Sequence, residues 1–173
     1  MLSAVADDWQ ASADLVAIIT GISAGIASSI GSLIAGYLTR LVSLRTLYLY
    51  LAAMSGVAEL AMGILPHNPT WFSIMTLINM AILGAAWAAV GGFCLQSMRG
   101  YGASTIYSTM ASLSNLPVYF GTIIFGMIQV KYGSTMMLAA EGALGLLSLV
   151  LFLGLLVLWP DHQPTAEATQ QPA

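Results

Sequence analysis

The segment WFSIMTLINMAILGAAWAAVGGFCL, from Trp71 to Leu95, contains no charged residue. An α-helix needs roughly 20 consecutive apolar residues to cross about 30 Å of hydrocarbon, and this segment is longer than that. The whole chain resembles it, because hydrophobic residues make up 58% and charged residues only 6% of its 173 positions. Soluble domains carry about 25% charged residues, so too few charges remain here to cover a water-facing surface. The composition predicts an integral membrane protein.

Five apolar runs of this kind follow one another along the chain, separated by short polar gaps. They cover residues 15–38, 47–65, 71–95, 106–130 and 135–159. None shows the polar–apolar alternation of β-barrel strands, so the spans are predicted to be helices. We therefore predict an all-α, polytopic bundle of about five transmembrane helices. It follows an N-terminal segment at 1–14 and precedes a polar, proline-rich tail at 160–173, for which we predict disorder.

The basic residues predict an orientation. Arg40, Arg45 and Arg99 lie in the first and third gaps, whereas Lys131 lies in the fourth. Since Lys and Arg collect on the cytoplasmic side, the first and third gaps and the C-terminal tail are predicted to be cytoplasmic, with the N-terminal segment outside. A bacterial inner membrane is the expected location. The acidic N-terminal segment lacks the basic region of a signal peptide, so we expect further helices upstream.

Several functional classes are not indicated. Four basic residues cannot form a nucleic-acid-binding patch. Cys94 is the only cysteine, which excludes an intrachain disulfide and a cysteine-clustered metal site. His67 and His162 have no paired ligands, and no Ser-His-Asp order, phosphate loop or zinc spacing occurs. We therefore predict no enzyme activity, no cofactor and no metal.

Small residues recur at helical spacing and predict close packing between helices. Such spacing lets backbones approach one another in lipid, where packing drives association. The residues concerned are Gly21, Gly25, Ala27, Gly31 and Ala35 in the first span, and Gly84, Ala88 and Gly92 in the third.

Tryptophans near predicted span ends are interpreted as anchors at the membrane interface, namely Trp9, Trp71 and Trp159. Trp87, in mid-span, is interpreted as packing, with stacking on a ligand as the alternative. Asp14 is expected to be a helix N-cap or a first-turn acid.

The first gap carries a motif. In GSLIAGYLTRLVSLRTLYLYLA, residues 31–52, the positions Gly36, Leu38, Arg40 and Arg45 fit a pattern of roughly G-x-L-x-D-R-x-G-R-R. This resembles the inter-helix signature of the major facilitator superfamily, although Thr39 stands where that family prefers Asp. The resemblance covers residues 12–160 and implies helices 8–12 of a twelve-helix transporter. Residues 99–126 are similar in character to the muropeptide permease and acetyl-CoA transporter branch.

The resemblance implies a function and a set of partners. The expected function is secondary active transport of a small solute by alternating access. The expected partners are the lipid bilayer, the solute with a possible coupled proton, and the missing transporter helices or another subunit. The alternative is a non-transporting small membrane protein, such as a subunit or assembly factor derived from a transporter half.

The fourth span contains a proline and polar side chains at its middle. Pro117 predicts a kink because its ring crowds the carbonyl of Leu113. Ser112, Ser114 or Asn115 can satisfy the freed backbone groups, which is a purely structural interpretation. The functional interpretation is that the kink exposes polar side chains to a substrate cavity. For the polar side chains of the third span, hydrogen bonds between helices are the alternative interpretation. The substrate-cavity candidates are Tyr107, Asn115, Pro117 and Tyr119, with Asn79 and Gln96 in the third span.

Two acids lie within predicted spans. Glu59 and Glu141 each sit roughly 10 Å below the outer end of a helix, at a rise of 1.5 Å per residue. Ionised carboxylates are costly at that depth, so such residues tend to face protein or water and mark ion paths. Both are candidates for proton coupling, and a hydrogen-bonded packing role or a snorkelling group is the alternative. We prefer Glu141, which shares a helix face with Gly145 and Ser148.

Overall fold

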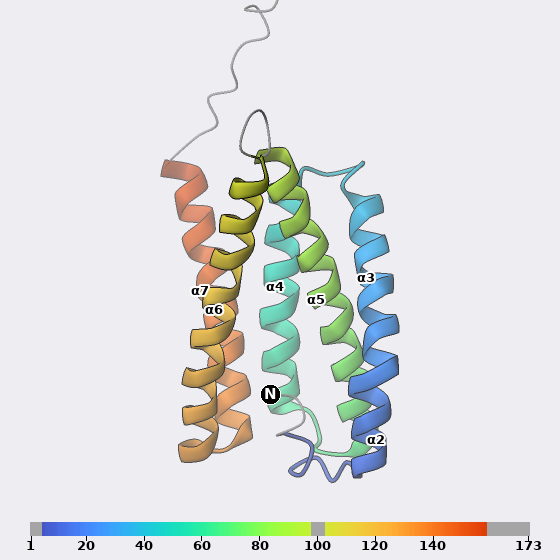
Figure 1. Ribbon diagram of the computed structural model, residues 1–173. Coiled ribbons are helices and arrows are strands. Elements are labelled where there is room, and N and C mark those ends of the chain that lie inside the picture. The colour runs from blue at the N-terminus through green and yellow to red at the C-terminus, as the bar shows by residue number, and fades with distance from the viewer. Residues whose placement is uncertain (1–4, 98–102, 159–173) are drawn as a thin grey trace, which may run out of the picture.

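The computed structural model describes residues 5–97 and 103–158, which fold into a helical bundle (Figure 1). Within these ranges five helices are long and apolar enough to cross a membrane, so the predicted all-α architecture with five spans is confirmed. Trp159, the tail and Arg99 lie outside the described residues. The elements are α2 (Ala13–Ile18), η1 (Ile19–Ser23) and α3 (Ala24–Leu38), which together form the first span, then α4 (Leu44–Ile64), α5 (Pro69–Ser97), α6 (Ala103–Tyr132) and α7 (Ser134–Leu158).

Side-chain caps set the starts of three helices. The Ser12 hydroxyl accepts a hydrogen bond from the Leu15 amide at 3.3 Å, and Ser43 caps α4 in the same way. The Asn68 side-chain oxygen accepts from the Trp71 amide at 2.9 Å, at the start of α5. These bonds satisfy amides that a helix start leaves unpaired. Asp14 lies in the first turn of α2, as expected, while Ser12 takes the N-cap.

The helices form a row in which α3 packs on α5, α5 on α4, α4 on α7, and α7 on α6 (Figure 1). The helix α6 is the least covered, because Phe125 is its only buried residue among positions 104–132. Apolar side chains cover most of its outward surface. The bundle therefore presents an open apolar flank along α6.

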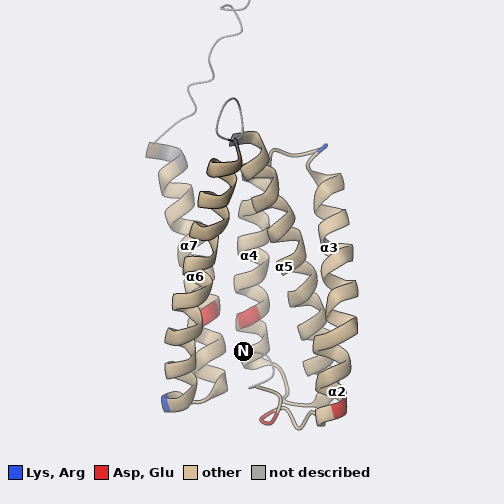
Figure 2. Ribbon diagram, in the orientation of Figure 1, with Lys and Arg blue, Asp and Glu red and all other residues tan. Residues whose placement is uncertain are grey.

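The connections alternate between the two ends of the bundle. The loop after α3 lies at the same end as the C-terminal end of α7, whereas the N-terminal segment, the α4–α5 loop and the α6–α7 turn lie at the other (Figure 1). Basic positions occur at the loop after α3 and at the opposite end of α6 (Figure 2). Arg40 and Lys131 therefore lie at opposite ends of the bundle, as the order of the predicted spans requires. The assignment of either end to the cytoplasm stays a prediction.

The contact between α3 and α5 depends on two glycines. A Cβ added at Gly31 would lie 1.9 Å from the Ala81 carbonyl oxygen, and one added at Gly84 would lie 2.1 Å from the Ser28 carbonyl oxygen. The Ser32 hydroxyl also donates to the Gly84 carbonyl at 2.9 Å across this contact. The predicted small-residue packing is confirmed here. Gly25, by contrast, faces open space.

A second glycine contact joins α4 to α7, and the sequence analysis missed it. A Cβ added at Gly142 would lie 2.8 Å from the Gly56 carbonyl oxygen, and one at Gly145 would lie 3.2 Å from the Gly56 Cα. The two helices therefore meet backbone to backbone. Ala52 and Gly56 are small residues four apart on α4, but spacing within α4 does not show that Gly56 meets α7.

Pro117 lies inside α6, and the kink expected there stays a prediction. The helix α6 continues through Pro117, and the Ser114 and Asn115 side chains donate to the Met110 and Ala111 carbonyls at 2.6 and 2.8 Å, not to the carbonyl that Pro117 frees. An interruption that was not predicted lies in the first span, where Gly21 has φ −90° and ψ −106° within the π-helical turn η1. Glycine tolerates such dihedral angles because it has no Cβ.

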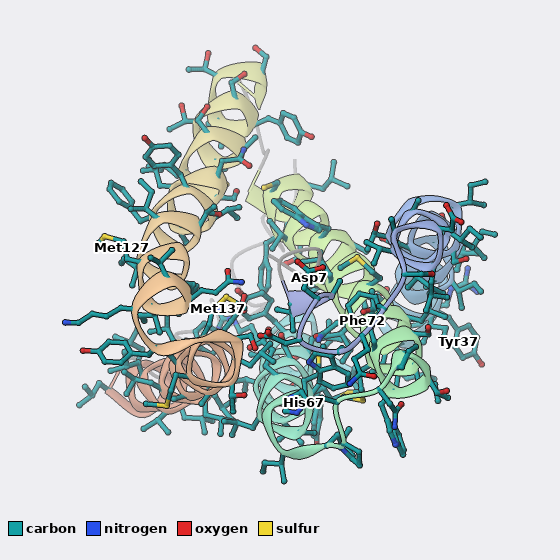
Figure 3. All side chains as sticks on the ribbon, turned by 90° about the horizontal axis from the view of Figure 1, so that it is seen from below. Asp7, Tyr37, His67, Phe72, Met127 and Met137 are labelled. Atoms are coloured by element: carbon teal, nitrogen blue, oxygen red, sulfur yellow. The ribbon has the colours of Figure 1, made fainter. Side chains whose placement is uncertain are left out.

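The N-terminal segment packs into the end of the bundle, which corrects the interpretation of Trp9 as an interface anchor. Val5 and Trp9 are fully buried, and the Trp9 ring packs edge-on against His67, with ring centroids 4.9 Å apart. Phe72 and Met137 point into the same region, whereas Met127 points away from the bundle (Figure 3). The Ser134 hydroxyl donates to the Asp8 carboxylate and ties the segment to α7. Because the indole is buried in protein, it cannot contact the lipid headgroups, as an interface anchor would.

The orientation can be tested by labelling cysteines in intact cells. With Cys94→Ala as background, Ser43→Cys is expected to resist an impermeant thiol reagent, because it lies at the arginine-bearing end, which the positive-inside tendency places in the cytoplasm. His67→Cys, exposed at the other end, is expected to react. Labelling of the Ser43 position without permeabilisation would reverse the orientation.

Candidate functional site

A cavity of about 390 Å³ lies among the first span, α4, α5 and α7. Its polar lining comes from all four of them, and its remaining walls are the apolar side chains of Met80, Leu83, Met137 and Leu138. The polar lining residues are Thr20 from η1, Ser55 and Glu59 from α4, Thr76 and Asn79 from α5, and Glu141 from α7.

Helical spacing and the α4–α7 glycine contact position the two carboxylates. Ser55 and Glu59 are one helical turn apart, and the Ser55 hydroxyl donates to Glu59 Oε1 at 3.1 Å. Glu141 immediately precedes Gly142, which touches α4. A Cβ added at Gly145 would lie 3.9 Å from Glu59 Oε2, so the Glu59 carboxylate reaches the surface of α7. Acidic positions on α4 and α7 lie at a similar height in the bundle (Figure 2).

The α5 wall supplies neutral polar groups. The Asn79 side-chain nitrogen donates to the Met62 sulfur at 3.3 Å, a weak acceptor. Thr76 is fully buried, and its hydroxyl has no hydrogen-bond partner within residues 5–97 and 103–158. Buried polar groups are nearly always paired, so each exception calls for an explanation. Thr76 therefore carries an unused donor and acceptor in the α5 wall of the cavity.

The cavity has a single sign of charge. Its ten lining residues include two glutamates and no lysine, arginine or histidine. Other titratable side chains at this end of the bundle include Asp7, Asp8, Asp14, His67 and Lys131, and these do not line the cavity. The Lys131 ammonium instead lies 5.0 Å from the centroid of the Tyr132 ring.

The structure brings together three of the candidate residues predicted from sequence, Glu59, Glu141 and Asn79. It adds Thr20, Ser55 and Thr76, which were not predicted. The spacing of Ser55 and Glu59, four residues apart, and of Thr76 and Asn79, three apart, is a signal that could have indicated Ser55 and Thr76. Thr20 had no such signal, because it depends on the interruption at Gly21.

The remaining candidates lie elsewhere. On α6, Asn115 and Pro117 are exposed, and Tyr107 and Tyr119 are 50% and 64% exposed. All four lie outside this cavity. Their role in a substrate cavity stays a prediction that depends on helices beyond those described.

A second hollow, of about 780 Å³, lies between the α3–α4 loop and α5, at the opposite end of the bundle. Gly36, Arg45 and Gln96 line it, so Gln96 is separated from the two glutamates. Arg40 is exposed in the loop. A Cβ added at Gly36 would meet nothing within 4 Å, so no close contact among the described residues requires glycine there.

Five helices of membrane-crossing length, four of which line a polar, acidic cavity, indicate a multi-pass membrane protein. In comparisons with known proteins, no family model, no curated protein and no solved structure matched the chain. The resemblance to the major facilitator superfamily therefore depends on the residues of the sequence motif alone.

Proposed function

We propose that the chain is part of a proton-coupled secondary transporter of the major facilitator type, moving a small solute by alternating access. The observation that supports this most is the convergence of Glu59 and Glu141, from different helices, on one cavity inside the apolar bundle. Ionisable residues within membrane spans are costly and mark ion or proton paths. Carriers place such groups together with the solute site near the middle of the membrane.

The surrounding cavity supports a coupling role rather than a purely packing role. The Glu59 carboxylate accepts from Ser55, and no basic side chain among the lining residues forms an ion pair with either glutamate. Gain or loss of one proton therefore changes the net charge of the cavity. The Arg40 and Arg45 motif is the further support for the family assignment.

The test is proton-driven uptake in liposomes, with the protein in the longest form that its reading frame encodes. A pH-sensitive dye inside reports proton entry while candidate solutes are added outside. Glu141→Gln is expected to abolish solute uptake driven by a pH gradient, because Gln keeps the shape of the side chain and cannot exchange a proton. Asp7→Asn, an acid outside the cavity, is the matched control.

Gradient-driven uptake that survives in both Glu141→Gln and Glu59→Gln would reject the coupling role. The alternative, a non-transporting subunit, is favoured by the open apolar flank of α6, which a partner helix would cover. The coding DNA upstream discriminates between the two. An open frame encoding about seven further spans supports the carrier, and a stop codon with a ribosome-binding site before Met1 supports the subunit.

A further inference from the structure

We propose that the cavity between α4, α5 and α7 binds a small organic ammonium ion, with its nitrogen between Glu59 and Glu141 and its hydrocarbon part against the apolar wall. This inference rests on the proposed function and deepens it by naming the substrate class. A cation that competes with protons for the same carboxylates would make the carrier a proton–cation exchanger.

The charge of the cavity is the first argument. Two carboxylates line it, and no lysine, arginine or histidine lies among the lining residues to neutralise them. A buried charge is stable only when it is paired or loses its charge by taking up a proton. A cationic ligand would bring a positive charge to this acidic lining. An anionic ligand would add repulsion, and a neutral one would leave the carboxylates unpaired.

The hydrogen-bonding groups give the second argument. An ammonium group has three N–H donors and no acceptor, while ionised carboxylates only accept. The Thr76 hydroxyl, fully buried and without a partner in the described part of the chain, is a further acceptor on the facing wall. Glu59, Glu141 and Thr76 thus supply acceptor oxygens from three helices that line one cavity. Ligand binding would explain why the Thr76 hydroxyl is left unpaired.

Size and wall chemistry decide between an organic cation and a bare metal ion. The cavity measures about 390 Å³, at the small end of the roughly 300–1,000 Å³ typical of small-molecule sites. A single water takes only about 30 Å³, so a lone metal ion would leave most of the space to be filled by water. Met80, Leu83 and Met137 form apolar walls, and methionines adapt to irregular hydrocarbon shapes. An ammonium ion with an apolar body fits both the acidic part and the apolar part of the lining.

The test is equilibrium dialysis of radiolabelled benzylamine against the full chain in detergent micelles at neutral pH. Unlabelled benzylamine, benzyl alcohol and benzoate then compete for the site, so three probes share one ring and differ in charge. The alcohol and the acid are expected to compete at least about tenfold more weakly, because they cannot form the charge-assisted bonds. Equal competition by benzyl alcohol, or no saturable binding of benzylamine, would overturn the proposal.

Variants locate the binding. Glu59→Gln and Glu141→Gln are each expected to weaken benzylamine binding by at least about tenfold, while Asp14→Asn, an acid outside the cavity, leaves it unchanged. Thr76→Val is expected to weaken binding but to raise the thermal midpoint of the empty protein, since it removes an unpaired buried hydroxyl. A purely structural role for Thr76 does not produce these opposite changes. If the glutamine variants fail to fold, competition among the three probes for the unaltered chain still tests whether the site prefers an ammonium ion.

Failure of this inference is distinguishable from failure of the proposed function. Saturable benzylamine binding without solute-driven proton movement in liposomes would support the ammonium site and reject transport. Proton movement driven by acidic or neutral solutes, without benzylamine binding, would keep transport and overturn the ammonium site.

Discussion

Gly31→Ala is expected to separate α3 from α5 and to destabilise the bundle by about 3 kcal/mol, at the upper end of overpacking effects. The added methyl group would lie 1.9 Å from the Ala81 carbonyl oxygen. Because the obstacle is backbone rather than a flexible side chain, one helix has to move. That movement also lengthens the hydrogen bond from Ser32 to the Gly84 carbonyl.

The same helix offers the matched control. A methyl group at Gly25 would meet nothing within 4 Å, so Gly25→Ala is expected to be neutral or slightly stabilising, as for glycine to alanine within a helix. Unfolding of both variants by titration with sodium dodecyl sulfate in mixed micelles measures the difference. Equal midpoints for the two variants would show that the α3–α5 contact is not backbone-limited.

Trp9→Ala is expected to lower the free energy of unfolding by about 3–5 kcal/mol, the range for removal of a fully buried large aromatic side chain. The Trp9 side chain is 0% exposed and packs against His67 and Phe72. Its loss leaves a void where the N-terminal segment closes the end of the bundle. The segment is therefore expected to detach, which protease cleavage within the first twelve residues would report.

Two further tryptophan variants serve as controls for this prediction. Trp9→Phe retains much of the packed volume and removes the indole N–H, which is buried without a hydrogen-bond partner in the described chain, so a smaller loss is expected. Trp87→Ala, at a position 45% exposed, is expected to cost far less than Trp9→Ala. A loss at Trp87 as large as that at Trp9 would contradict burial as the cause.

The number and limits of the spans could be predicted because they depend on composition along the chain. Each predicted run corresponds to one helix, and the helix starts differ from the predictions by a few residues because Ser12, Ser43 and Asn68 cap earlier turns. The Gly31–Gly84 contact was also predictable, since small residues repeat within both helices.

The rest required knowledge of which faces meet. Gly56 and Gly142 pair across two helices, and no pattern within either helix predicts the other. That contact places Glu59 and Glu141 at the same cavity. The sequence therefore indicated two acids at similar depth but did not show that they share one cavity. The interpretation of Trp9 was wrong because a tryptophan near the end of a span is typical of the membrane interface. Its burial depends instead on how the N-terminal segment packs against the helices, which is a matter of tertiary structure.

A single residue separates α6 from α7, and this governs how the two helices enter the bilayer. The helix α6 ends at Tyr132 and α7 begins at Ser134, with Gly133 between them at φ +86°, in the left-handed region that favours glycine. One residue cannot span any part of the hydrocarbon, so neither helix can complete its crossing while the other waits outside. The pair is therefore expected to insert together as a hairpin, with Lys131 close to its tip.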